Sequence, residues 1–234
     1  MYPDDALAPT DSCASRGPDC TSRSAALAAL LAIVGNVLAV AQLTDSPHAY
    51  KVESLELWLR ELVAKPDGHE AAAWLFTIGV LMLIPFAMGL QRRLTGSACA
   101  WLGAWLVAMG AGMNAVACMT PWVVVRVLLG RMGEPGVEAL SLALLGFTLV
   151  LDAIFNLLFG CGMVLCGAAQ WGRGSKVIGA LGVIAGIATV SVVGQAYSDE
   201  AARRLAIAGP LWLAWVAASG YGLTASKWSV AANA

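Results

Sequence analysis

The residues with the clearest potential for chemistry are Thr148, Asp152 and Asn156, which lie four residues apart within an otherwise apolar stretch, Ser141–Cys166. About 20 predominantly apolar residues cross the hydrocarbon core of a bilayer, so this stretch predicts a transmembrane helix with an acid near its centre. An ionisable side chain at that depth costs roughly 2.5–3.5 kcal/mol on insertion. On a helix the three side chains share one face. We therefore expect this face to point into the protein, where it binds a proton, a cation or the polar end of a ligand.

Three polar side chains in other apolar stretches are candidates for the same site: Asn36, Asn114 and Gln195. The alternative interpretation is an interhelical hydrogen-bond network that only fixes packing, worth about 0.6 kcal/mol per contact on average. An acid suits packing alone poorly, because it carries a larger desolvation cost than an amide. Both interpretations stay open for Asp152, and packing is favoured for the three amides.

The residue types that intramembrane catalysis or metal binding requires are misplaced. Both histidines, His48 and His69, fall in one polar loop, where we expect them on the surface; this excludes a bis-histidine haem or a histidine-rich metal centre within the membrane. The six cysteines form no C-x-x-C pair. Ser219 stands in a Ser-Gly-Tyr-Gly run without a histidine or lysine in the membrane to activate it. The sequence therefore predicts no catalytic residue, metal site or cofactor.

The composition is typical of a multi-pass membrane protein. Of 234 residues, 59% are hydrophobic and 12% are charged, and the mean hydropathy is +0.74. Soluble domains carry about 25% charged residues. The net charge of −1 gives no indication of nucleic acid as a partner. We expect the partners to be membrane lipid, a small-molecule ligand, and a second copy of the chain or another membrane protein.

The hydrophobic pattern predicts an all-α fold, a polytopic integral membrane bundle of six transmembrane helices with amphipathic segments in the two long outer loops. Residues 1–23, rich in Pro, Asp and Ser, are expected to form a disordered cytoplasmic tail. The membrane domain is expected over 24–225, followed by a short C-terminal tail, 226–234. The predicted spans are 24–43, 71–90, 97–120, 141–166, 177–197 and 205–224.

The connections between the spans carry signals of their own. In the first outer loop, residues 50–65 have apolar positions at heptad-like spacing and predict an amphipathic helix that lies on the membrane or caps the bundle and is closed by Pro66. Pro85 predicts a kink in the second span. The apolar segment 122–132 contains two arginines and is either a surface helix, which we favour, or a bent continuation of the third span. Residues 170–176 are expected to form a tight polar loop.

Six spans place both termini on one side of the membrane. The compact loops on that side contain Arg92, Arg93, Arg173 and Lys176 without an intervening acid. Because cytoplasmic loops are those enriched in Lys and Arg, we expect both termini to lie in the cytoplasm.

The fifth span contains a GxxxG pair, Gly182 and Gly186, which predicts close helix packing. The polar turn and glycine-rich span over 168–190 resemble an uncharacterised bacterial family of six-helix membrane proteins, a domain of unknown function. In that family such a turn leads into a span of the form lGvllliaG, which 178–186 resembles, although the family usually has a proline in the turn where this chain has Ser175-Lys176. The resemblance implies a six-helix architecture in a bacterial inner (cytoplasmic) membrane, and no particular activity.

Two functions are compatible with these patterns. The leading hypothesis is a membrane protein that binds or transports a small molecule or lipid around an intramembrane centre formed by Asp152 and Asn156. The alternative is a non-catalytic subunit or regulator of a larger membrane complex, in which Gly182 and Gly186 contact another chain. An intramembrane enzyme ranks last, because the histidines are misplaced and the apolar core has no paired carboxylates.

Overall fold

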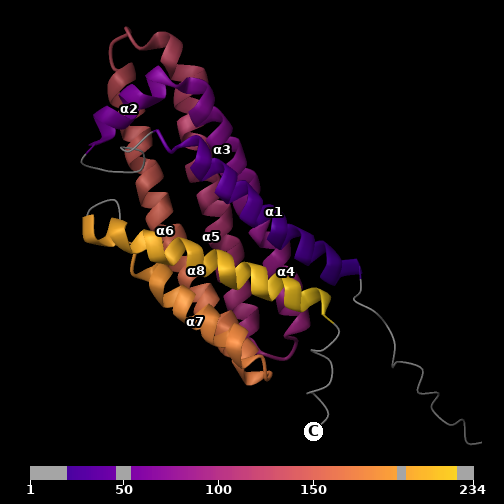
Figure 1. The fold of residues 1–234 in the computed structure, drawn as a ribbon. Helices are drawn as coiled ribbons and strands as arrows, with labels where there is room; N and C mark the ends of the chain where they lie inside the picture. The colour runs from indigo at the N-terminus through magenta and orange to yellow at the C-terminus, as the bar shows by residue number, and fades with distance from the viewer. Residues whose placement is uncertain (1–19, 46–53, 194–198, 226–234) are drawn as a thin grey trace, which may run out of the picture.

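The computed structural model describes residues 20–45, 54–193 and 199–225 (Figure 1). All regular structure in these ranges is helical, which confirms the expected all-α class. The α-helices are α1 (Cys20–Gln42), α2 (Leu55–Ala64), α3 (Pro66–Leu81), α4 (Leu83–Arg93), α5 (Ala98–Val123), α6 (Val137–Gly172), α7 (Lys176–Val190) and α8 (Asp199–Thr224). A π-helix, Val124–Leu128, and a 3₁₀ turn, Leu129–Arg131, extend α5.

Within the described ranges, five helical stretches are long and apolar enough to cross a membrane: Cys20–Gln42, Pro66–Arg93, Ala98–Arg131, Val137–Gly172 and Arg203–Thr224. The predicted span 177–197 is represented by α7, whose 15 residues extend about 22 Å at roughly 1.5 Å per residue. That length is shorter than a hydrocarbon core of about 30 Å. The architecture is therefore that of a polytopic membrane protein with five candidate spans and one shorter apolar helix.

The helices other than α2 form a ring. α1 lies against α3 and α4, α5 lies between α3 and α6, and α7 follows α6. α8 packs against both α7 and α1 and closes the ring; Figure 1 shows α7 and α8 side by side. Large buried side chains fill the centre, chiefly Phe86, Phe159, Met163 and Trp215. The rings of Phe86 and Trp215 meet edge to face at 5.7 Å, which ties α4 to α8.

A second apolar cluster covers the end of the bundle at which α2 lies (Figure 1). Trp58 and Leu62 of α2 belong to it together with Leu128 of the π-helix and Leu145 of α6. The described part of the predicted amphipathic segment therefore buries its apolar face against the bundle as a cap. The first residues of that segment, 50–53, lie outside the described residues.

Two prolines change the predicted helix boundaries. α3 begins at Pro66, because a proline in the first turn lacks only an N–H that would have no helical acceptor. The expected end of the amphipathic helix is confirmed, since α2 ends at Ala64 directly before Lys65-Pro66, but the helix of the second span starts at Pro66 and not at the expected residue 71. Pro85 does interrupt the second span: α3 ends at Leu81 and α4 begins at Leu83, since Pro85 has no N–H to donate to the carbonyl four residues earlier. At the N-terminal side, α1 starts at Cys20, so residues 20–23 of the expected tail are helical.

The segment 122–132 continues α5 without a break. Pro121, inside the helix, cannot donate to the carbonyl of Ala117, and the wider π-helical turn follows directly. In that turn the N–H of Leu129 bonds to the carbonyl of Val124, five residues earlier. The favoured surface helix is therefore wrong, and the alternative, a continuation of the third span, is what the chain forms.

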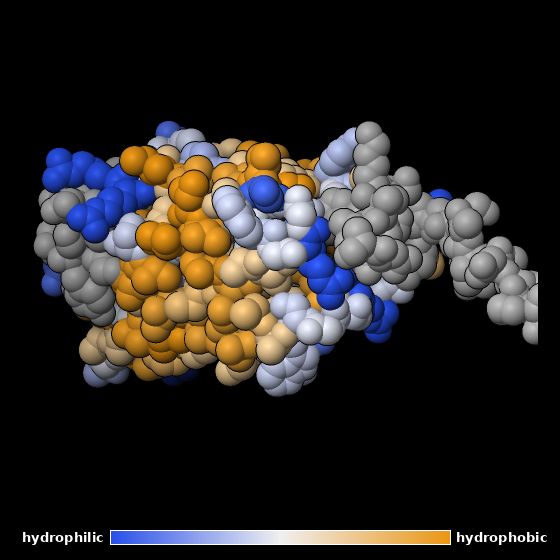
Figure 2. Space-filling view, turned by 90° about the horizontal axis from the view of Figure 1, so that it is seen from below, coloured by the Kyte–Doolittle hydropathy of each residue, from blue (hydrophilic) through white to orange (hydrophobic). Residues whose placement is uncertain are grey.

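Large apolar side chains lie exposed around the outside of the ring, among them Leu30, Trp101, Phe147, Ile187 and Ile207. Figure 2 shows an apolar band on the face seen from below, with hydrophilic regions toward its two ends. Soluble monomers rarely expose large contiguous apolar patches. Lipid tails cover such a band without loss of hydrogen bonds, which agrees with a membrane protein.

Candidate functional site

Asp152 lies near the middle of α6, as the sixteenth of its 36 residues counted from Val137. Asn156, one turn later, donates from Nδ2 to Asp152 Oδ2 at 3.1 Å. Asn156 is buried, whereas Asp152 is partly exposed. The four-residue spacing thus produces a carboxylate oriented by a neighbouring amide, at a depth close to the centre of the span.

α5 brings two further polar side chains to this interface. Cys118 lies close enough to Asp152 for an electrostatic interaction. Its thiol also donates to Asn114 Oδ1 at 3.8 Å, and both residues are buried. The structure therefore gathers Asn114, Cys118, Asp152 and Asn156 between α5 and α6. The sequence indicated three of these residues; Cys118 was missed, although its position four residues after Asn114 was an available signal.

The other predicted site residues lie elsewhere or are occupied. Thr148 is fully buried, and its hydroxyl donates to the carbonyl of Leu144 in its own helix at 3.2 Å. Asn36 lies between α1 and α3, where its amide donates to the carbonyl of Ala32 at 2.8 Å and packs against Gly79. Gln195 lies outside the described residues. The site that the structure assembles is therefore smaller than the predicted set.

The GxxxG pair of α7 packs against helices of the same chain. A Cβ added at Gly186 would lie 2.5 Å from the carbonyl oxygen of Gly160 in α6. A Cβ added at Gly182 would lie 2.5 Å from the indole nitrogen of Trp215 in α8. Both glycines thus allow α7 to approach its two neighbours closely. Because α6 and α8 cover this face, it is not available to a second chain.

A buried polar network between α6 and α8 was missed by the sequence reasoning. Gln170, expected in a polar loop, lies in the last turn of α6 and is fully buried. Its amide nitrogen donates to Ser219 Oγ at 2.9 Å, and its amide oxygen accepts the indole N–H of Trp215 at 3.0 Å. All three side chains satisfy each other, which indicates a structural link between the helices and not a reactive serine.

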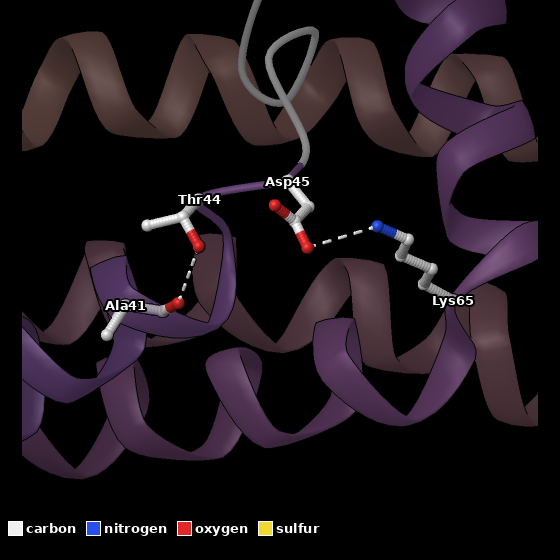
Figure 3. A network of polar contacts seen from close by, with 4 residues as sticks. All are labelled: Ala41, Thr44, Asp45 and Lys65. Atoms are coloured by element: carbon white, nitrogen blue, oxygen red, sulfur yellow. Dashed lines mark hydrogen bonds and ion pairs between the residues drawn. The ribbon is translucent and has the colours of Figure 1, made fainter.

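Charged residues at the α2 end form ion pairs. Arg126 Nη2 lies 2.5 Å from Glu70 Oε2, and Trp122 Nε1 donates to the other carboxylate oxygen of Glu70 at 3.2 Å. Figure 3 shows a second pair, in which Lys65 Nζ lies 3.4 Å from Asp45 Oδ2. The Glu70 contacts tie α3 to the π-helical segment, so their evident role is structural.

The described residues contain no group of three His, Cys, Asp or Glu that could hold a metal ion. His69 is 4% exposed, so the expectation of a surface position is wrong for this histidine. His48 lies outside the described residues. Among the described residues, the Asp152 cluster therefore stays the candidate site for a function other than metal binding by such a group.

Comparison with protein-family models, curated proteins and solved structures finds no match for the chain. The inference of function therefore starts from two observations, the membrane architecture and the polar cluster between α5 and α6. Neither depends on analogy with another protein.

Proposed function

We propose that the chain is a multi-pass membrane protein that binds or transports a small molecule between α5 and α6, with Asp152 and Asn156 as the polar end of the site. The observation that carries this proposal is the 3.1 Å hydrogen bond from Asn156 Nδ2 to Asp152 Oδ2 at the middle of a 36-residue apolar helix. An ionised carboxylate only accepts hydrogen bonds. It therefore selects a ligand with positive charge or N–H and O–H donors: a proton, a metal cation or an organic ammonium.

The energetic cost of the acid supports a role beyond packing. An interhelical hydrogen bond in a membrane contributes about 0.6 kcal/mol on average, whereas an aspartate at the centre of a span costs roughly 2.5–3.5 kcal/mol. A cation or proton bound at Asp152 neutralises the charge, and the partial exposure of this residue gives a ligand access to the carboxylate.

The membrane arrangement is part of the same proposal. α7 would make the sixth crossing as a short helix between α6 and α8, which gives the six-helix form of the uncharacterised bacterial family. The start of α1 and the end of α8 both lie at the last turn of α4. Arg92 of that turn donates to Thr21, and Arg93 donates to the carbonyl of Ala225. The Lys and Arg residues of this end support a cytoplasmic position for it. The proposed location of the bundle is the bacterial inner membrane.

The experiment is a cation screen by thermal unfolding of the protein in lipid nanodiscs. The probes are Na⁺, K⁺, choline and tetraphenylphosphonium, each as the chloride at equal ionic strength. A ligand present at about 100 times its Kd stabilises the folded state by roughly 2.7 kcal/mol, which raises Tm by several degrees for a chain of this size. We expect at least one probe to raise the Tm of the wild type and to have no effect on Asp152→Asn.

Glu138→Gln is the matched control, because it removes an exposed acid from the first turn of the same helix. It should respond to every probe as the wild type does. Equal responses of wild type and Asp152→Asn to all four probes would refute the assignment of a cation site.

A further inference from the structure

The described residues at the end of the bundle opposite α2 include five basic side chains. They are Arg23 at the start of α1, Arg92 and Arg93 at the end of α4, and Arg173 and Lys176 around the turn from α6 to α7. The described segments that form this end, 20–24, 90–98, 170–177 and 222–225, contain no acid. A strong excess of positive charge therefore faces the boundary between membrane and water.

Three of these arginines bond to neutral acceptors of the described chain. Arg92 Nη1 donates to Thr21 Oγ1 at 3.4 Å, Arg93 Nη2 donates to the carbonyl of Ala225 at 3.4 Å, and Arg173 Nη2 donates to the carbonyl of Thr95. At the α2 end, by contrast, the ion pairs are Lys65–Asp45, Arg126–Glu70 and Arg131–Glu134. Within the described residues, carboxylates thus pair with cations at the α2 end, whereas these acceptors of Arg92, Arg93 and Arg173 at the other end carry no charge.

A pocket of about 340 Å³ lies beside this charge, at the turn between α4 and α5. Arg92, Thr95, Ser97 and Trp101 line it, and the guanidinium of Arg173 is bonded to the backbone of the same turn. Gly96 makes the turn possible, since its φ of +82° is one that other residues rarely adopt. The pocket surface itself is mainly apolar, and the residues around it carry a guanidinium, two hydroxyls and an indole ring. This combination suits an apolar body in the pocket with a phosphate at its rim.

An exposed apolar track continues from the pocket along α5. Trp101, Trp105 and Met109 follow each other at four-residue spacing and are 54%, 46% and 55% exposed. The two indoles meet edge to face at 6.3 Å. Tryptophan is enriched where headgroups meet acyl chains. The track therefore provides an apolar surface for an acyl chain that runs from the pocket along α5.

We infer that this pocket binds the phosphate-bearing headgroup of an anionic phospholipid, with one acyl chain along Trp101, Trp105 and Met109. Basic pockets between transmembrane helices recognise anionic headgroups, and juxtamembrane arginines attract them. Free phosphate shares the chemistry of the headgroup but gains nothing from the apolar track. The site lies at a helix turn and involves no residue of the Asp152 cluster, so the two proposals stand independently.

The test measures which lipid contacts Trp101 in the full-length protein. Vesicles of phosphatidylcholine with a minor fraction of phosphatidylglycerol are prepared with brominated acyl chains on one lipid or the other, because bromine quenches nearby tryptophan fluorescence. The difference between the wild type and Trp101→Phe isolates one signal among nine tryptophans. We expect brominated phosphatidylglycerol to quench Trp101 well beyond its share of the lipid. Arg92→Gln should lower this preference roughly fivefold, and Arg92→Lys should keep most of it.

Arg60→Gln is the matched control, because it removes an exposed arginine from α2 at the other end of the bundle. It should leave the preference for phosphatidylglycerol unchanged. Inorganic phosphate, added at an ionic strength matched with chloride, should not displace the lipid; displacement would assign the pocket to free phosphate and overturn the inference. Equal preferences in the wild type and Arg92→Gln would overturn it as well.

Discussion

The indole N–H of Trp215 donates to the amide oxygen of Gln170 at 3.0 Å, although the two residues lie on different helices and 45 positions apart in the chain. The amide nitrogen of Gln170 donates to Ser219 Oγ at 2.9 Å. One glutamine therefore satisfies two side chains of α8, and all three are fully buried. This contact holds the last turn of α6 against α8, at the side of the ring that α7 also borders.

Replacing Gln170 with leucine should destabilise the fold. The indole N–H of Trp215 and the hydroxyl of Ser219 would lose their partner in an apolar interior, which costs about 1–3 kcal/mol. Reversible unfolding in mixed detergent micelles measures the change. Gln42→Leu, at the exposed last residue of α1, is the control and should have little effect. Combined with Trp215→Phe, the Gln170 effect should be less than additive; strict additivity would mean that the hydrogen bond contributes nothing.

Two glycine-to-alanine changes should have opposite effects on stability. At Gly186 the added methyl would lie 2.5 Å from the backbone oxygen of Gly160, so α7 must move away from α6, with an expected loss of roughly 1–3 kcal/mol. At Gly112, in the middle of α5, nothing lies within 4 Å of the added methyl, and alanine should stabilise the helix by about 0.4–1 kcal/mol. Thermal unfolding of both variants in nanodiscs tests the pair. A stabilising Gly186→Ala would show that α7 does not pack closely against α6.

The sequence predicted the existence of most helices because each contains about 20 apolar residues, whose transfer into lipid dominates the free energy of that segment. It did not predict those helix ends that depend on distant partners. Gln170 is polar and follows an apolar run, so it favoured a loop; only Trp215 and Ser219 allow it to stay buried in a helix. Similarly, Pro66 is a helix breaker in most contexts but serves as the first residue of α3.

The candidate site was predictable to the extent that it lies on one helix. Asp152 and Asn156 share a face by their spacing alone, and their hydrogen bond follows from that spacing. The neighbours from α5 depend on how α5 and α6 are aligned. That register is fixed partly by close backbone packing, since a Cβ at Gly103 would lie 2.9 Å from the carbonyl of Gly162. No local pattern reports this alignment. Spacing alone could therefore group Cys118 with Asn114 but not with Asp152, and Asn36 was placed with the wrong group.

The two ion pairs at the α2 end should differ in strength. Glu70 and Arg126 lie 2.5 Å apart, and the glutamate side chain is only 18% exposed, whereas Asp45 and Lys65 in Figure 3 lie 3.4 Å apart and are 80% and 54% exposed. Exposed pairs are screened by solvent and salt. Double-mutant cycles should therefore give a measurable coupling free energy for Glu70→Gln with Arg126→Gln, and none for Asp45→Asn with Lys65→Gln. The first coupling should decline in high salt; equal couplings for both pairs would contradict this explanation.

The proposed orientation predicts which positions a membrane-impermeant maleimide reaches. Lys176→Cys lies at the end opposite α2 and Glu138→Cys at the α2 end, and both positions are exposed. In a cysteine-free background, right-side-out vesicles should label Glu138→Cys and leave Lys176→Cys unlabelled. Inside-out vesicles should give the reverse pattern. Labelling of Lys176→Cys from the outside would place the termini on the other side of the membrane.

Replacing Asp152 with leucine separates a binding role from a packing role. On insertion scales an aspartate at the centre of a span costs about 2.5–3.5 kcal/mol, whereas leucine is favourable by about 0.3–0.6 kcal/mol. The hydrogen bond to Asn156, which leucine cannot make, contributes about 0.6 kcal/mol on average. If the carboxylate is kept for a ligand, Asp152→Leu should unfold at the same or a higher denaturant concentration than the wild type while losing every cation response. A loss of stability instead would mean that Asp152 is retained because it holds α5 and α6 together. In that case Asp152→Asn, which preserves a hydrogen-bonding partner for Asn156, should restore most of the stability.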